Sequence, residues 1–416
     1  MLNRLPQIKI LSNGFKIICI ENKNIRTVAL NLRGLVGSNY EAENEIGVAH
    51  FLEHVLLASA EKQLIYDVGG KIVSSTSRED VFYYVKLLDS DIERGLAFLA
   101  QIFRQPHAQE SELVTQKEII RQEIKRAVDN PEKYIFRLAY KLLYPNARPE
   151  KLNTGGIDDV QKIDTDNLKT FFQKNYNAQN FALSVCGDIR SDRIFKHAEK
   201  YFSKIDSNPR QNFKPFKQDT GVRVQVENRN HISQSHLLAS FYGFPRFSKE
   251  SYVLKYISQT LAGESISILP NIIRTGKGFA YKVLASSFSS THINGFGIYT
   301  ACEEKNVQNV LILIKKALHY YSHKLIDEYI FSRAKNSLVA DLIFSFERPS
   351  VIADFYSDIA LSDRYKYTHQ DELDMLTSIT KEDILETAQK LFAQEPKLTV
   401  ITPTLTKSEI EKFWQD

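Results

Sequence analysis

Two segments of the chain repeat the same order of polar and apolar positions. Residues 163–176 and 379–392 are offset by 379 − 163 = 216 positions, and their acidic, aliphatic, Gln-Lys and aromatic residues align without a gap. Each segment begins with a capping signature, Thr165 or Thr380 before acidic residues, and continues with apolar residues at helical spacing. The pattern therefore predicts two corresponding helices. A run typical of a strand follows each helix, at residues 181–186 and 398–401.

The repeat continues upstream of these helices. Runs rich in aromatic and β-branched residues, at 81–88 and 296–302, predict strands. A helical apolar pattern follows each run at an offset of 307 − 92 = 215, with Ile92, Leu96 and Leu99 in the first half and Val307, Leu311 and Ile314 in the second. Self-similarity at about half the chain length predicts two homologous domains in tandem. Strands and helices mix without regular βαβ alternation, so we expect an α+β fold class, with helices packed on a largely antiparallel sheet in each domain.

The boundary between the two domains is predicted at residues 207–221. This stretch has two prolines, many polar residues and no periodicity, which is typical of a linker. We therefore expect a first domain at 1–206 and a second domain at 222–416. A length of 416 residues suits two domains better than one core.

Composition narrows the classes of partner and compartment. The formal charge is only +4, and the basic residues are interleaved with acidic ones, so we expect no nucleic-acid partner. No apolar run approaches the roughly 18 residues of a membrane span. The N-terminus has neither a signal-peptide nor a transit-peptide pattern, and the three cysteines are far apart and odd in number. These features predict reduced cysteines and a cytoplasmic location.

The candidate chemistry lies in an apolar helical segment of the first half. His50, Glu53 and His54 stand at i, i+3 and i+4, so they share one helix face. Two imidazoles there can chelate one zinc ion, and the carboxylate between them can act on a water molecule, as in the inverted zincin motif H-x-x-E-H. The alternative is a chance grouping on a solvated face. The apolar flanks argue against that alternative, because burying these three groups without a metal would be costly.

A catalytic zinc usually takes three protein ligands, and the third is expected from another helix. Glu123, in the charged helical stretch 118–126, shares a face with the apolar Ile119 and Ile120, whereas Glu118 lies on a different face. Spacing alone is equally compatible with an inward ligand at Glu123 and with an exposed glutamate in a salt-bridged helix.

At these residues the sequence resembles the pitrilysin/insulinase family of zinc peptidases, and in size its mitochondrial-processing-peptidase-like branch. The resemblance covers nearly the whole chain. In the first half it is carried by the Gly-Ser…Glu…Gly-Val-Ala-His segment that leads into the motif, at 37–50, and by the segments 69–84 and 116–123 that follow the motif. In the second half it is carried by an Arg…Gly-Phe-Ala-Tyr segment at 274–281. The resemblance implies that Glu123 is the third ligand of one Zn2+ per chain.

The resemblance also implies a reaction and its participants. Zinc-activated water would hydrolyse a peptide bond, with Glu53 as the general base. Arg274 and Tyr281 would bind the substrate backbone or the developing oxyanion. Without the family resemblance, the simpler interpretation is that Tyr281 is a core residue of a strand and Arg274 a charged residue at the end of a helix. The substrate would bind as an added strand along a sheet edge. The edge residues are Val73, Ser74, Ser75 and Thr76.

A half-length chain of this family is expected to form half of a clamshell. Because the zinc motif and the Arg/Tyr pair are both present, a homodimer is the simplest assembly, and a heterodimer with a related half-length chain is the other. The cavity would enclose peptides or unfolded polypeptide segments.

The sequence departs from the family pattern at three places. Gln116 stands where many members have a glutamate that supports the zinc site, and Val73-Ser74 replaces a usual Asn-Ala pair. The stretch between His54 and Gly69 is also shorter than usual. These departures keep a non-catalytic scaffold or partner subunit open as an alternative, and a zinc hydrolase of non-peptide substrates is a second one. A further histidine pair, His319 and His323, has helical spacing but no carboxylate between its members, which favours incidental metal affinity.

Overall fold

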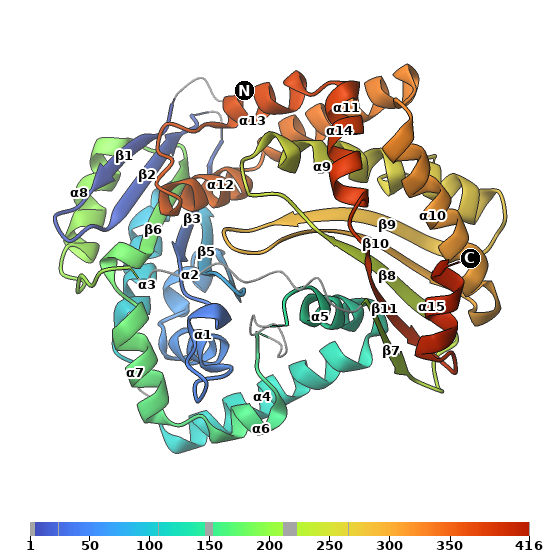
Figure 1. Cartoon of the computed structure of the whole chain (residues 1–416). Coiled ribbons are helices and arrows are strands. Elements are labelled where there is room, and N and C mark those ends of the chain that lie inside the picture. Colours follow the sequence, from blue (N-terminus) through green and yellow to red (C-terminus); the bar gives the residue numbers. More distant parts are fainter. Residues whose placement is uncertain are drawn as a thin grey trace. The chain divides into compact units, whose positions relative to one another are not determined.

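The structure is a computed structural model that describes residues 5–23, 25–106, 108–145, 153–210, 223–264 and 266–415. Its contacts divide the chain into two compact units. Unit 1 comprises residues 1–125, 151–213 and 343–369, and unit 2 comprises residues 126–150, 214–342 and 370–416. Both units mix strands with helices, so the α+β class is confirmed (Figure 1).

The strands form one sheet in each unit. The six-stranded sheet of unit 1 has the order β1 (Gln7–Ile10), β2 (Lys16–Glu21), β6 (Phe181–Gly187), β3 (Thr27–Gly34), β5 (Val81–Leu88) and β4 (Lys71–Thr76). The five-stranded sheet of unit 2 has the order β7 (Val224–Asn228), β11 (Lys397–Thr402), β8 (Ser235–Tyr242), β10 (Asn294–Cys302) and β9 (Ala280–Ser289).

The helices are, in chain order, α1 (Val48–Ser59), α2 (Gln63–Tyr66), α3 (Ile92–Ala100), α4 (Glu110–Asp129), α5 (Pro131–Leu143), α6 (Ile157–Lys162), α7 (Thr165–Asn175), α8 (Ser191–Phe202), α9 (Lys249–Ala262), α10 (Val307–His323), α11 (Glu328–Ser345), α12 (Pro349–Leu361), α13 (His369–Ser378), α14 (Lys381–Phe392) and α15 (Lys407–Gln415). None of the helices in the described ranges is long and apolar enough to cross a bilayer.

The two sheets repeat one topology. The order β2-β6-β3-β5-β4 in unit 1 matches β7-β11-β8-β10-β9 in unit 2. In each sheet the first of these pairs is parallel, β2 with β6 and β7 with β11, and the remaining pairs are antiparallel. The repeat predicted at offsets of 215 and 216 is therefore present in the sheets.

The cap of the first helix of that repeat lies one residue earlier than expected, so the helix begins at Thr165 itself. In α7 the cap is Asp164, whose side chain accepts the N–H of Asn167, while Thr165 is already the first helical residue. Thr380 is the cap of α14, as expected. The two observed caps, Asp164 and Thr380, are therefore separated by 380 − 164 = 216 residues, which equals the offset between the two helices.

The units differ from the continuous domains 1–206 and 222–416, because each contains a helix from the opposite half of the sequence. Helix α5, from the first half, packs on β8 and β11 of unit 2, and helix α12, from the second half, packs on β2, β3 and β6 of unit 1. Both follow a long helix and begin with proline, Pro131 or Pro349. Most of the expected linker, from residue 211 onward, lies outside the described residues.

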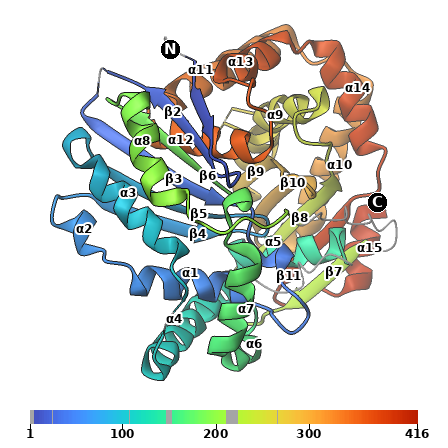
Figure 2. The same ribbon diagram turned by 90° about the vertical axis from the view of Figure 1, so that its left-hand side faces the viewer.

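The sheet of unit 1 is covered on both faces, which explains its apolar strands. Figure 2 shows α3 and α8 in front of the strands and α12 behind them. Side chains alternate along β3, so Ala29 packs in the cluster beneath α12, while Leu30 approaches Gly95 of α3. Strand β4 forms one of the two edges of this sheet.

Candidate metal centre

Helix α1 has a fixed starting point. Gly47 precedes it with a φ of 86°, a conformation that glycine adopts readily, and a Cβ there would lie 2.6 Å from the carbonyl oxygen of Thr154. The carboxylate of Glu41 accepts hydrogen bonds from the N–H groups of Gly47 and Ala49, both at 3.0 Å. These N–H groups lie where a helix has no internal acceptors and favours negative charge. The start of α1, and with it the direction of its motif face, is thereby set.

The two motif histidines project from successive turns of α1. Their ring centroids are 4.6 Å apart, and the side chains keep 13% and 18% exposure. Nδ1 of His54 lies 3.2 Å from Oε1 of Gln116 on α4. Because an amide oxygen can only accept, this contact places a hydrogen on Nδ1, and in that tautomer of the neutral ring Nε2 is the nitrogen available to a metal. Burial, followed by the neighbouring His54, lowers the pKa of His50 to about 3, so its imidazole is neutral at pH 7, the form that binds metal.

Glu123 approaches the same point from α4. Its Oε2 lies 3.7 Å from Nε2 of His50 and 3.8 Å from Nε2 of His54, which is too long for hydrogen bonds. Because His50 is neutral, its contact with Glu123 is not an ion pair. The three ligand atoms lie within 4.8 Å of one another. Ligand atoms held about 2.1 Å from a tetrahedral zinc are about 3.4 Å apart, so a small contraction would complete such a site. The donor set therefore fits zinc.

The surroundings of Glu123 distinguish it from other glutamates of α4. Glu118 forms a salt bridge with Arg121, as expected of an exposed helix residue. Glu123 instead faces the two histidines with a side chain that is 38% exposed. Within the described residues, His50, His54 and Glu123 form the one cluster of three His, Cys, Asp or Glu side chains with this spacing.

Glu53 lies beside this cluster and is almost fully buried. Its Oε1 accepts the hydroxyl hydrogen of Ser74 and its Oε2 accepts that of Thr76, both at 2.5 Å. Burial raises the pKa of Glu53, and the two hydroxyls and His54 act in the opposite direction without cancelling that effect. A carboxylate in this position is suited to accepting a proton.

Strand β4 divides the expected substrate residues between two faces. Ser74 and Thr76 face α1 through their bonds to Glu53, whereas Val73 is 51% exposed and Ser75 is exposed as well. β4 pairs with β5 over residues 71–76 and is an edge strand, as expected. The sequence pattern gave no indication that the hydroxyls of Ser74 and Thr76 bond to Glu53.

Arg274 and Tyr281 lie together in unit 2. Arg274 is in a π-helical turn, η6 (Pro270–Thr275), and its guanidinium carbon lies 5.7 Å from the centroid of the Tyr281 ring. Tyr281 stands on the edge strand β9 and is 79% exposed, so it is not a core residue. Both side chains offer hydrogen-bond donors.

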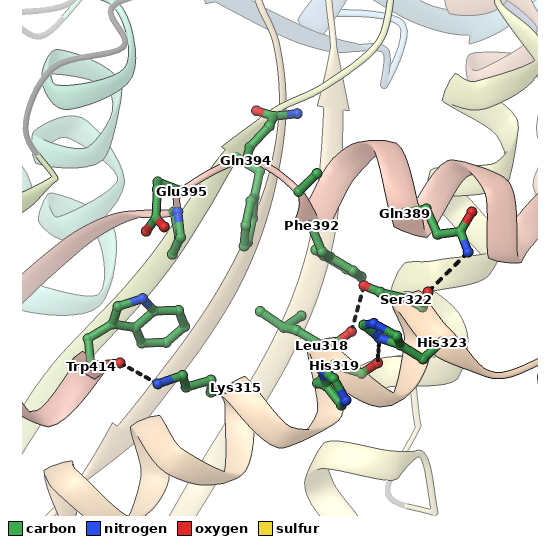
Figure 3. A pocket seen from close by; sticks show the side chains of 13 residues that line it. Lys315, Leu318, His319, Ser322, His323, Gln389, Phe392, Gln394, Glu395 and Trp414 are labelled. Carbon is green, nitrogen blue, oxygen red and sulfur yellow. Dashed lines mark hydrogen bonds between the residues drawn. The ribbon is translucent and has the colours of Figure 1, made fainter. Parts of the chain in front are cut away.

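The second histidine pair lines a cavity of about 480 Å³ in unit 2 (Figure 3). The rings of His319 and His323 are stacked with centroids 4.0 Å apart, and Nδ1 of His323 lies 2.8 Å from the carbonyl oxygen of His319. Glu395 lines the same cavity, but Figure 3 shows it on the opposite side. Among the described residues this pair has no third ligand, so it does not form a site like that of unit 1.

Fold and cluster together define a class of protein. An α+β chain with an H-x-x-E-H helix facing a glutamate on a second helix has the arrangement of an inverted-zincin metallopeptidase. Two family models match the chain, "Insulinase (Peptidase family M16)" over residues 16–151 and "Peptidase M16 inactive domain" over residues 162–338. The chain belongs to the pitrilysin/insulinase family of peptidases, M16.

Individual relatives agree with this assignment. An uncharacterized zinc protease of Rickettsia felis is 28% identical over 94% of this chain and 96% of its own length. The beta subunit of the mitochondrial-processing peptidase of Saccharomyces cerevisiae is 22% identical over 93% of this chain and 88% of its own length. The crystal structure of a protease from Helicobacter pylori superposes with a TM-score of 0.87 at 18% identity, over 95% of this chain and 98% of the other. That structure supports the fold.

Proposed function

We propose that the protein is a zinc-dependent endopeptidase. His50, His54 and Glu123 hold the metal, and Glu53 is the general base. The observation that carries the proposal is the convergence of three ligand atoms within 4.8 Å next to a buried carboxylate that does not belong to the ligand set. A structural salt-bridge cluster would not need a neutral His50 or a second, separate carboxylate.

The residues of the candidate site have different proposed roles in peptide hydrolysis. A zinc ion bound here would polarise the scissile carbonyl and lower the pKa of a water molecule to about 7. Glu53 would accept a proton from the attacking water molecule and return it to the leaving amine. Its burial favours this exchange, because a raised pKa brings the carboxyl group closer to the working pH. Gln116 keeps the hydrogen of His54 on Nδ1 and so keeps Nε2 available.

The substrate is proposed to be an extended peptide or an unfolded segment. Strand β4 stands at an edge of its sheet, and pairing of such a segment with β4 would provide main-chain hydrogen bonds with little dependence on sequence. Arg274 and Tyr281 are proposed to donate to the scissile carbonyl as it becomes negative. Because the family resemblance implies that a half-length chain forms half of a clamshell, we propose a homodimer in which this pair completes the site of a second copy. A related chain in a heterodimer is the other arrangement, and relatives named as subunits support it.

A non-catalytic subunit is the competing function. Gln116 and Val73 depart from the family pattern, and the model matched by residues 162–338 is described as an inactive domain. The ligand set and Glu53 are intact, which favours the enzyme.

The test is hydrolysis of a mixture of unstructured peptides by the zinc-loaded protein, read by mass spectrometry. We expect cleavage by the wild type and by Glu61→Gln, a control at an exposed glutamate just beyond α1. Glu53→Gln, which keeps shape but cannot accept the proton, should cut at least about a hundredfold more slowly. Equal rates for wild type and Glu53→Gln would contradict the proposal, and zinc binding without cleavage by any of the three would favour the non-catalytic subunit.

A further inference from the structure

The carboxylate of Glu53 is held between two hydroxyls of one strand. Ser74 and Thr76 are two residues apart on β4, so their side chains point to the same face, and each donates to a different oxygen of Glu53 at 2.5 Å. These are short, charge-assisted hydrogen bonds. Within the described residues, neither hydroxyl bonds to any other side chain.

Two bonds constrain the carboxylate in a way that one cannot. The last torsion of a glutamate side chain is broad, so a single hydroxyl leaves the carboxylate plane free to rotate. A second hydroxyl on the other oxygen fixes that plane. Strand β4 can hold both hydroxyls in place, because β4 is paired with β5 along its length and Asn153 donates to the carbonyl oxygen of Thr76 at 3.3 Å.

The two hydroxyls are not equivalent. Thr76 is β-branched and buried, so its hydroxyl is held by packing. Ser74 is only half-buried and can take other rotamers.

We propose that Ser74 is a positioning residue that fixes the carboxylate plane of Glu53. The inference rests on the proposed role of Glu53 as general base and adds a second determinant of its orientation. Ser74 acts through Glu53 and not on the substrate, so its loss should slow turnover without weakening substrate binding.

The test has one readout without metal and one with it. In crystals of the metal-free protein, we expect one orientation of the Glu53 carboxylate in the wild type and in Ser74→Thr, and a rotated or multiple orientation in Ser74→Ala. With zinc bound, Ser74→Ala should lower kcat about three- to tenfold while its KM stays within about twofold of the wild-type value. Ser74→Thr should have a kcat close to that of the wild type. Ser90→Ala is the matched control, since that exposed hydroxyl bonds only to neighbouring Asp91 in the described residues.

Two results would overturn the role of Ser74. One is an unchanged Glu53 carboxylate in Ser74→Ala, and the other is a raised KM at constant kcat, which would make Ser74 a substrate contact. If the wild type cuts no peptide, the proposed function fails, but the metal-free crystals still decide whether Ser74 orients Glu53.

Discussion

Gln116 contacts the candidate metal centre with a neutral amide. It stands seven residues before Glu123 and accepts a hydrogen bond from Nδ1 of His54 at 3.2 Å. A neutral amide fixes the tautomer of the imidazole as a carboxylate would. It adds no negative charge, so the histidine should be a weaker donor to the metal than it would be beside a glutamate.

This difference predicts opposite effects of two substitutions on zinc affinity. Gln116→Ala should weaken binding about tenfold or more, because the acceptor for His54 is lost, and Gln116→Glu should strengthen it. Competition with a chromophoric chelator measures both. Gln122→Ala, an exposed amide on the same helix, should bind zinc like the wild type. Equal affinities for Gln116→Ala and the wild type would show that the contact does not support the metal.

The sequence predicted local parts of the site better than distant ones. His50, Glu53 and His54 lie on one helix, so their shared face follows from helical periodicity alone. Glu123 comes from another helix, and only the family resemblance could choose it. The bonds from Ser74 and Thr76 to Glu53 join a strand to a helix. The sequence does show two hydroxyl residues at alternate positions of an edge strand. This spacing indicates that both side chains lie on one face of the strand, but it does not indicate which residue that face contacts.

At the level of elements, the exchange of α5 and α12 between the halves of the chain is the main departure from expectation. An amphipathic pattern shows that a helix buries one face, but it is the same whichever sheet receives that face. Helix α12 is also tied to β3 by polar contacts, since Asp354 accepts from Asn31 and Arg33, each at 2.9 Å. Sequence order alone therefore assigns these helices to the wrong sheets.

The exchange predicts where a core substitution will act. Ile352 of α12 and Ile135 of α5 are both fully buried, and replacing either with alanine should cost about 2–5 kcal/mol. Ile352→Ala should speed amide hydrogen exchange in β2, β3 and β6, and Ile135→Ala should speed it in β8 and β11. Each variant is the control for the other. Faster exchange of β8 and β11 in Ile352→Ala, with β2 and β6 unaffected, would mean that α12 belongs to the sheet of its own sequence half.

At the level of the whole molecule, one topology is used twice, and among the described residues the candidate metal centre is found in one copy, that of unit 1. Helix α1 follows β3 and precedes the edge strand β4, as α9 follows β8 and precedes the edge strand β9. Helix α9 contains no histidine. The repeat was readable from α7 and α14, where both copies keep the same helical pattern. It was not readable from α1 and α9, because only α1 keeps the residues of a metal site.

The central claim is that His50, His54 and Glu123 hold one zinc ion per chain. The most direct test is the zinc content of the purified full-length protein after dialysis, measured by atomic spectroscopy for the wild type, Glu123→Gln and Glu118→Gln. We predict one zinc per chain for the wild type and well below one for Glu123→Gln. Glu118→Gln should also bind one zinc per chain, because Glu118 pairs with Arg121 and is not a proposed ligand. Full zinc content in a folded Glu123→Gln, or none in the wild type, would contradict this account of the site.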